Sequence, residues 1–231
     1  MTTLLAGDIG GTKTLLSLHA VGDTAPVLLT STRYASADWT GLGDMVRHFL
    51  AGIDGHDHPS VACLAVAGPV MEGRARLTNL PWQLSETDLA VDCGIERVEL
   101  VNDFAVLIYG LPHLQAHQQA PIRAGCDGQE IGLSGEPLLI LGAGTGLGVA
   151  MGLPGPGGLR AVASEAAHGS FAARSPDEWD LREWLCHDLD LERLSIERVV
   201  SGTGLGHVAR WLLARRHPNS CLLYTSDAAD E

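Results

Sequence analysis

The sequence predicts an α/β fold, and three observations support this prediction. Two stretches far apart in the chain, Leu4–Leu18 and Leu138–Leu153, share one pattern: an apolar run, a turn rich in Gly and Thr, and a second apolar run. Apolar runs this short favour strands over helices. Elsewhere, short strand-like runs alternate with segments of helical spacing. Such alternation is typical of a mixed sheet covered by helices.

Composition limits the function classes. The chain has 231 residues, of which 45% are hydrophobic and 19% charged, enough for one large or two modest domains. It contains no run of about eighteen apolar residues and no basic-then-apolar N-terminal segment, so we expect a cytoplasmic protein without a membrane partner. The formal charge of −13 also disfavours nucleic acid as a partner. Five scattered cysteines without a CxxC pair indicate reduced thiols.

The first glycine turn, GDIGGTKT, lies between the first two apolar runs. It contains Asp8, Gly10, Gly11, Thr12 and Lys13, the only lysine of the chain. We expect the two glycines to adopt backbone angles that other residues tolerate poorly. A carboxylate, a hydroxyl and glycine amides are groups that hold a metal-bound polyphosphate. The alternative is an ordinary glycine hairpin.

The second glycine turn, Gly142–Gly148, has the same pattern. Two such hairpins suggest a cleft whose walls each offer backbone amides to one nucleotide. Two other nucleotide-binding loops are excluded. The phosphate loop GxxxxGK[ST] does not occur, and the dinucleotide fingerprint GxGxxG would have to open a helix, whereas apolar, strand-like residues follow this turn.

The first half of the chain reads as one α/β domain. We expect a strand over 27–30, a polar loop over 36–39, and a helix over 44–51 that ends at Gly52. A buried strand over 61–66 and a turn centred on Gly73 follow. Next come a helix that begins at Ser85 and closes near Gly94, and a strand over 98–101. Asn79 is a candidate ligand for a polar group or a turn cap. Asp103 follows the last of these strands, where it is either a helix N-cap or a general base at the mouth of the sheet.

The second half begins with an irregular segment over 113–137. After the second glycine turn we expect a loop at LPGPGG that returns to 161–163, and then a helix that begins at Ser175-Pro176. Two further helices are expected over 196–200 and 205–216, capped by Ser195 and Thr203. Glu165 and His168 either face one ligand or form a local surface pair. Glu197 falls in the first turn of its expected helix, where it would complement the dipole.

Seven motifs, taken together and in this order, resemble the bacterial glucokinase family: GDIGGTKT, AVAGPV, TNLPW, VNDF, GAGTGLG, SEAAH and ERVVSG. That family belongs to the sugar kinase, Hsp70 and actin ATPase superfamily. The resemblance implies a two-domain actin-like (ribonuclease H-like) architecture with the second domain incomplete. We expect a first domain over 1–112, a partial second domain over 113–220, and a non-native tail over 221–231, which resembles the translation of a sequencing adapter.

The resemblance also implies an activity. The protein would transfer the γ-phosphoryl group of ATP to the 6-hydroxyl of D-glucose with Mg²⁺, and it would be a homodimer when full length. We expect the present chain to be impaired, with weak ATP affinity, because the adenosine-binding part of the family pattern is missing. The alternatives are a kinase for another hexose, a non-catalytic sugar-binding regulator, and an ATPase of the chaperone or filament class.

The family's functional residues transfer to matching positions. Asp103 would be the catalytic base. Sugar hydroxyls would be bound by Asn102, Asp103, Glu165, His168 and Glu197, with Asn79 as a further candidate. ATP phosphates would contact Gly7, Asp8, Ile9, Gly10, Gly11, Thr12, Gly144, Thr145 and Gly146, with Asp8 also near Mg²⁺.

One departure from the family pattern concerns the sugar site. Many family members have Glu-Gly-Gly-His where this chain has Glu165-Ala166-Ala167-His168. If either position required a positive φ, alanine there would cost roughly 1 kcal/mol or shift the loop.

Overall fold

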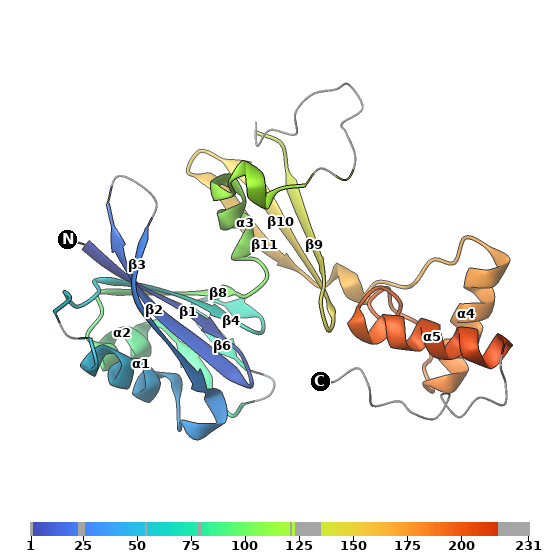
Figure 1. The fold of residues 1–231 in the computed structure, drawn as a ribbon, viewed down its shortest axis with the longest axis horizontal. Coiled ribbons are helices and arrows are strands. Elements are labelled where there is room, and N and C mark those ends of the chain that lie inside the picture. Colours follow the sequence, from blue (N-terminus) through green and yellow to red (C-terminus); the bar gives the residue numbers. More distant parts are fainter. Residues whose placement is uncertain are drawn as a thin grey trace. The chain divides into compact units, whose positions relative to one another are not determined.

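The computed structural model describes residues 2–22, 26–53, 55–77, 80–120, 122 and 135–216. These residues form two compact units, Met1–Ala120 and Pro121–Glu231, which are coloured along the chain in Figure 1. Asn79 and the expected tail over 221–231 lie outside the described residues. Within the described part of the chain, no helix is both long and apolar enough to cross a membrane.

The first unit is built on a five-stranded sheet with the order β3-β2-β1-β4-β8. Its strands are β1 (Thr2–Ile9), β2 (Lys13–Val21), β3 (Val27–Ala35), β4 (Val61–Val66) and β8 (Arg97–Asn102). The first three strands are antiparallel, whereas β4 and β8 run parallel to β1. In the register, Ile9 lies beside Val66 and Val66 beside Asn102. The C-terminal ends of three strands therefore meet at one edge of the sheet.

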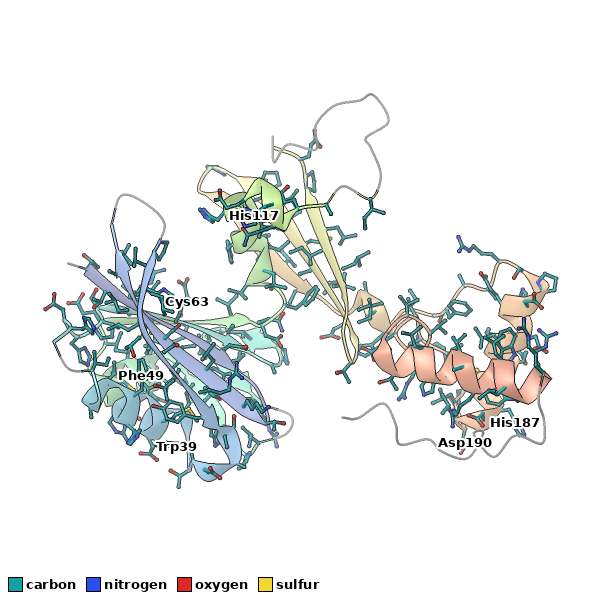
Figure 2. All side chains as sticks on the ribbon, in the orientation of Figure 1. Trp39, Phe49, Cys63, His117, His187 and Asp190 are labelled. Carbon is teal, nitrogen blue, oxygen red and sulfur yellow. The ribbon has the colours of Figure 1, made fainter. Side chains whose placement is uncertain are left out.

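Two helices, α1 (Leu42–Ala51) and α2 (Glu86–Cys93), cover one face of this sheet (Figure 1). The apolar face of α1 includes Met45 and Phe49, which pack in one core with strand residues such as Leu5 and Leu64. Phe49 is labelled in Figure 2. In β4 the side chains alternate between fully and partly buried. The face of the sheet that packs against the helices is therefore the more buried one.

The helix expected from Ser85 is confirmed. The Ser85 hydroxyl accepts a hydrogen bond from the amide of Asp88 at 3.4 Å, and Gly94 ends the helix with a φ of 66°. The turn at Gly73 is also confirmed, inside a small sheet of β5 (Val70–Met71), β6 (Arg74–Arg76) and β7 (Gln83–Ser85). The remaining short helices of this unit are η1 (Ser36–Asp38), α3 (Leu107–Gly110), η2 (Leu111–His113) and η3 (Ala116–Gln118).

The second unit contains a three-stranded antiparallel sheet with the order β11-β10-β9. Its elements are β9 (Leu138–Ala143), β10 (Leu147–Gly155), β11 (Gly158–Ser164), η4 (Ala166–His168), α4 (Pro176–Asp188) and α5 (Gly202–Arg216). The two long helices share a small core with Leu181, Leu185 and Trp211. The indole of Trp211 donates to Asp180 at 2.9 Å, which gives its buried N–H a partner.

The start of α4 agrees with the sequence, because the Ser175 hydroxyl accepts from the amide of Glu178 at 3.2 Å. Two other predictions were wrong. Residues 196–200 form turns and not a helix, since so short a segment gains little from helical hydrogen bonds. Ser201 caps α5, not Thr203: its hydroxyl accepts from the amide of Gly204 at 2.8 Å.

The segment LPGPGG is also different from expectation. It forms the end of β10, a two-residue turn and the start of β11, so it closes a hairpin and is not an irregular loop. Gly158 has a φ of 100° there, a backbone conformation that glycine adopts without strain.

Three of the five cysteines lie in the described part of the chain, and all three are free thiols, as predicted: Cys63, Cys93 and Cys186. Burial raises the pKa of the Cys63 and Cys93 thiols. Cys63 of β4 is labelled in Figure 2. The thiols of Cys63 and Cys93 are therefore inert and structural.

Candidate active site

One group of candidate residues lies in the first unit, at the edge where β1, β4 and β8 end. The amide of Ala67 donates to the carbonyl of Ile9 at 3.1 Å, and the amide of Asp103 donates to the carbonyl of Val66 at 2.9 Å. The pattern of parallel strand pairing thus continues one residue past each strand. It places Asp103 on the same edge as the first glycine turn, as the sequence predicted.

The first glycine turn is a tight hairpin between β1 and β2. The amide of Gly10 donates to the carbonyl of Lys13 at 3.0 Å. Contrary to our expectation, neither Gly10 nor Gly11 is among the described glycines with positive φ. The requirement at Gly10 is steric instead, because a Cβ there would lie 2.8 Å from the carbonyl oxygen of Lys13. Glycine is needed for close approach of two backbone segments and not for an unusual backbone angle.

Two buried hydroxyls behind this turn were missed by the sequence analysis. The Ser36 hydroxyl donates to the carbonyl of Gly10 at 2.8 Å and lies 3.0 Å from the Thr14 hydroxyl. Both side chains are fully buried. Because Ser36 has one proton, and uses it on Gly10, the Thr14 hydroxyl must be the donor between the two. The only local signal was a serine in a polar segment.

Residues 7–9, which precede the first glycine turn, are part of a strand and not of the turn itself. Gly7, Asp8 and Ile9 belong to β1, which is paired with strands on both sides, and the Ile9 side chain is fully buried in the core. Asp8 and Thr12 are exposed. The open part of the hairpin is therefore Gly10–Thr12, with the Asp8 side chain beside it.

Asn102 is the cap of the chain segment that follows β8. Its Oδ1 accepts from the amides of Phe104 at 3.2 Å and Ala105 at 2.9 Å, while its side-chain amide donates to the carbonyl of Gly68 and to Oδ1 of Asp103, both at 3.1 Å. These four bonds use the full capacity of the side chain. Capping is thus performed by Asn102, and the Asp103 carboxylate remains available for chemistry.

The environment of Asp103 alters its acidity. Partial burial raises its pKa above the ordinary value, an effect partly offset by a hydrogen bond from the backbone amide of Phe104 and reinforced by the negative charge of Asp8. The side chain still contacts solvent. A carboxylate with a raised pKa is a stronger base than an ordinary surface aspartate.

Another group of candidate residues lies in the second unit, around the turn between β9 and β10. The amide of Gly144 donates to the carbonyl of Gly146 at 2.9 Å. The start of α5 holds this turn from outside: the amide of Gly202 donates to the carbonyl of Gly144 at 2.7 Å, and the Thr203 hydroxyl donates to the carbonyl of Thr145 at 3.1 Å. The turn is therefore fixed by residues more than fifty positions later in the chain.

Glu165, His168 and Glu197 lie together next to this turn. Nε2 of His168 is 3.3 Å from Oε2 of Glu165, and its Nδ1 is 3.9 Å from Oε1 of Glu197. The Glu165 side chain is 82% exposed, whereas that of Glu197 is 28% exposed. The surface-pair interpretation of Glu165 and His168 is incomplete, because a third, partly buried carboxylate faces the same imidazole.

The two alanines between Glu165 and His168 cause no backbone strain. They lie in η4, and the described non-glycine residues with positive φ are Glu72 and Asp190; Asp190 is labelled in Figure 2. The cost that we considered for alanine at this motif therefore does not arise.

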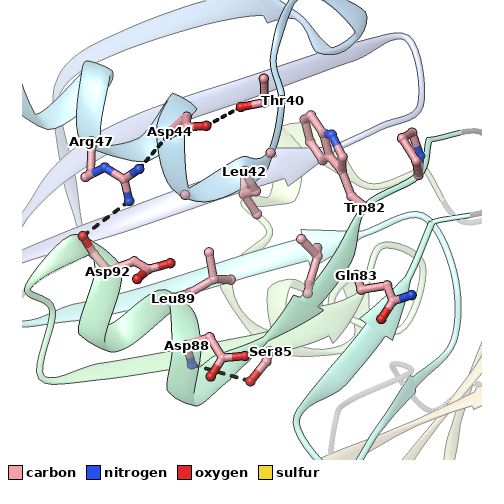
Figure 3. A pocket seen from close by; sticks show the side chains of 14 residues that line it. Thr40, Leu42, Asp44, Arg47, Trp82, Gln83, Ser85, Asp88, Leu89 and Asp92 are labelled. Carbon is pink, nitrogen blue, oxygen red and sulfur yellow. Dashed lines mark hydrogen bonds and ion pairs between the residues drawn. The ribbon is translucent and has the colours of Figure 1, made fainter.

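A cavity of about 280 Å³ lies elsewhere in the first unit, between α1, α2 and β7 (Figure 3). Its lining includes Asp44, Arg47, Ser85 and Asp92 but none of the predicted site residues. The acidic group of Asp44 bonds to Thr40 and Arg47, and the Thr40 hydrogen bond and the Arg47 charge lower its pKa. These polar groups join two helices, so we place the site at the glycine turns instead.

The chain is similar to known glucokinases. The family model described as Glucokinase matches residues 5–230, a range that includes most of the segment expected to be foreign. The glucokinase of Synechocystis sp. is 43% identical over 218 residues, covering 90% of this chain and 60% of that protein. The glucokinase of a Nostoc species is 38% identical over 217 residues, covering 94% of this chain and 62% of that protein.

Solved structures give the same result. A glucokinase from an Antarctic psychrotroph aligns with a TM-score of 0.79 and 31% identity, covering 93% of this chain and 65% of that one. A Balamuthia mandrillaris glucokinase, solved in complex with glucose, aligns with a TM-score of 0.73 and 24% identity over 96% of this chain and 66% of that one. The chain therefore has the actin-like kinase fold of these proteins. It spans about three fifths of the length of the curated relatives it matches.

Proposed function

We propose a function for this chain from the premise that it belongs to the glucokinase family. It forms part of an enzyme that transfers the γ-phosphoryl group of ATP to the 6-hydroxyl of D-glucose. One observation supports this above the others. Each compact unit combines a glycine turn with groups suited to a sugar: Asp103 lies at the same sheet edge as the first turn, and Glu197, with Glu165 and His168, lies at the second turn.

Asp103 acts as the general base. A primary alcohol is a poor nucleophile, and a carboxylate within hydrogen-bond reach accepts its proton as the phosphoryl group arrives, a contribution of about 10²–10⁴ in rate. The raised pKa of Asp103 increases its basicity. Its orientation is held by Asn102, whose side chain has no remaining capacity for a sugar hydroxyl unless one of its four bonds opens.

The sugar hydroxyls bind to the cluster of Glu165, His168 and Glu197. Ionised carboxylates are strong acceptors for hydroxyl donors, and an imidazole offers either a donor or an acceptor. The three groups face one another within a few ångströms. Such a cluster can bind neighbouring hydroxyls of a hexose, and a panel of hexoses tests which of them it accepts.

The phosphates of ATP bind to backbone amides of the two glycine turns, Gly10–Thr12 and Gly144–Gly146. Among the described residues, no three or more His, Cys, Asp or Glu side chains form a metal cluster. Mg²⁺ is usually held by one or two carboxylates together with substrate phosphates. Asp8, exposed beside the first turn, would hold the ion. When bound, Mg²⁺ neutralises charge that develops on the transferring phosphoryl group.

The test is ATP-dependent phosphorylation across a panel of hexoses. Because the chain covers 60% of its Synechocystis relative, the assay uses this chain extended after Arg216 by the corresponding C-terminal part of that relative, hereafter the extended chain. We expect glucose 6-phosphate as the product, and an activity about 10²–10⁴ lower in Asp103→Ala. The matched control is Asp38→Ala, an exposed aspartate of the same unit.

Two outcomes would count against the proposal. Turnover that is undiminished in Asp103→Ala would remove the assigned base. An extended chain that folds but phosphorylates no hexose would remove the kinase assignment.

A further inference from the structure

The carboxylate of Glu197 contacts two parts of the second unit with its two oxygens. Oε2 accepts a hydrogen bond from the amide of Leu147 at 2.9 Å, and Oε1 lies 3.9 Å from Nδ1 of His168. Leu147 directly follows Gly144–Gly146, the residues between β9 and β10. One partly buried side chain therefore joins the turn to the segment that contains Glu165 and His168.

The backbone around Glu197 reinforces this connection. The amide of Glu197 donates to the carbonyl of Ala167 at 3.1 Å, between Glu165 and His168. A few residues later, Gly202 and Thr203 bond to the carbonyls of Gly144 and Thr145. The segment 197–203 therefore contacts the residues 165–168 through its first residue and the turn 144–146 through its last two residues.

A steric contact shows that the turn is shaped around this carboxylate. A Cβ at Gly146 would lie 2.7 Å from Oε2 of Glu197 and 3.4 Å from its Cδ, whereas a Cβ at Gly144 would meet nothing within 4 Å. A side chain at position 146 would therefore clash with the carboxylate of Glu197, the end of a flexible side chain, in the position that it occupies here. A side chain there would displace the carboxylate, the turn, or both.

We propose that Glu197 is a positioning residue that couples sugar binding to the geometry of the second glycine turn. This inference rests on the proposed function. A sugar hydroxyl that donates to Oε1 would fix the orientation of the carboxylate, and the fixed carboxylate would hold the Leu147 amide and the turn before it. Because coupling between two ligands is reciprocal, glucose and nucleotide would each increase the affinity for the other.

The coupling predicts that a substitution in the nucleotide turn weakens sugar binding when no nucleotide is present. We would measure glucose binding to the extended chain by calorimetry, without ATP, for the unchanged protein and for Gly146→Ala. The matched control is Gly157→Ala in the turn between β10 and β11, where an added Cβ meets nothing within 4 Å and φ is not in the left-handed region. We expect glucose affinity to fall about tenfold or more in Gly146→Ala and to stay unchanged in the control.

A second measurement reports on the turn itself. Hydrogen exchange at the Leu147 amide is followed with and without glucose, in the unchanged protein and in Glu197→Ala, with thermal unfolding to verify that each variant folds. We expect glucose to slow exchange at this amide in the unchanged protein only.

The outcomes separate the two proposals. If the unchanged protein binds glucose and Gly146→Ala binds it equally well, the coupling through Glu197 is overturned while the proposed function stands. The coupling is also overturned if glucose binds and hydrogen exchange at the Leu147 amide does not change. If the unchanged protein folds but binds no glucose, the proposed function fails and this inference fails with it.

Discussion

The side-chain amide of Asn102 donates a hydrogen bond of 3.1 Å to Oδ1 of Asp103. The same nitrogen donates to the carbonyl of Gly68, and the side-chain oxygen accepts from two backbone amides that follow Asp103. Asn102 thus ties the carboxylate to the end of β4 and to the next turn of the chain. The orientation of the proposed base is determined by its neighbour in sequence.

The substitution Asn102→Asp tests this relationship through pH dependence. It keeps the size of the side chain, removes both donors, and places a negative charge beside Asp103, which raises the pKa of Asp103 further. Because the base acts only when deprotonated, we expect the acidic limb of kcat/KM against pH to move to higher pH. Asn102→Ala removes the donors without adding charge and should lower kcat with a smaller displacement of that limb. Superimposable pH profiles for the three proteins would contradict this role.

The raised pKa of Asp103 also predicts how stability depends on pH. Its folded-state pKa lies above the ordinary value of 3.8, so this group favours folding most below pH 3.8, and the benefit is lost as the pH rises through the folded-state pKa. At neutral pH the ionised carboxylate therefore opposes folding. We expect Asp103→Asn to raise Tm at pH 7 and the difference to shrink towards pH 3, as followed by circular dichroism. A Tm at pH 7 below that of the unchanged protein would show that the sign is wrong.

The buried hydroxyl of Ser36 should contribute to the stability of the first glycine turn. In Ser36→Ala, the carbonyl of Gly10 and the hydroxyl of Thr14 lose their partner inside the protein, which costs about 1–3 kcal/mol of unfolding free energy. Denaturant unfolding measures this loss. The control Ser31→Ala changes an exposed serine of the neighbouring β3, where substitutions usually fall within about 0.5 kcal/mol. Equal stabilities of the two variants would argue against the hydrogen-bond assignment.

Restoring the family pattern at the sugar motif should not help. Since neither Ala166 nor Ala167 has a positive φ, glycine relieves no strain there and adds conformational entropy to the unfolded chain. We expect Ala167→Gly, at a buried position, to lower unfolding free energy by about 0.5–1 kcal/mol with no gain in glucose affinity. Thermal unfolding and calorimetry of the extended chain would test both parts. A clear gain in affinity would mean that the bound state requires a backbone that this structure does not show.

Much of the site could be predicted from local patterns. Both glycine turns, the strand that ends at Asn102, and the capped helices at Ser85 and Ser175 follow from short-range preferences of apolar runs, glycine and capping side chains. Errors arose where a local pattern was too short to decide. Residues 196–200 have helical spacing but form turns, and the cap of the last helix is Ser201.

The sequence by itself determined which residues are candidates for the chemistry: the two glycine turns, Asp103, and the acid and imidazole groups at 165, 168 and 197 are proposed from the order of the motifs that resemble the glucokinase family. The tertiary structure alone decided that Gly146 lies against Glu197, which hydroxyl supports the first turn, and which oxygen of Glu197 holds Leu147. Those features depend on atoms that approach one another from positions 26 to 51 residues apart. Contacts of that range arise only when strands pair and pack, so no local pattern in the chain encodes them.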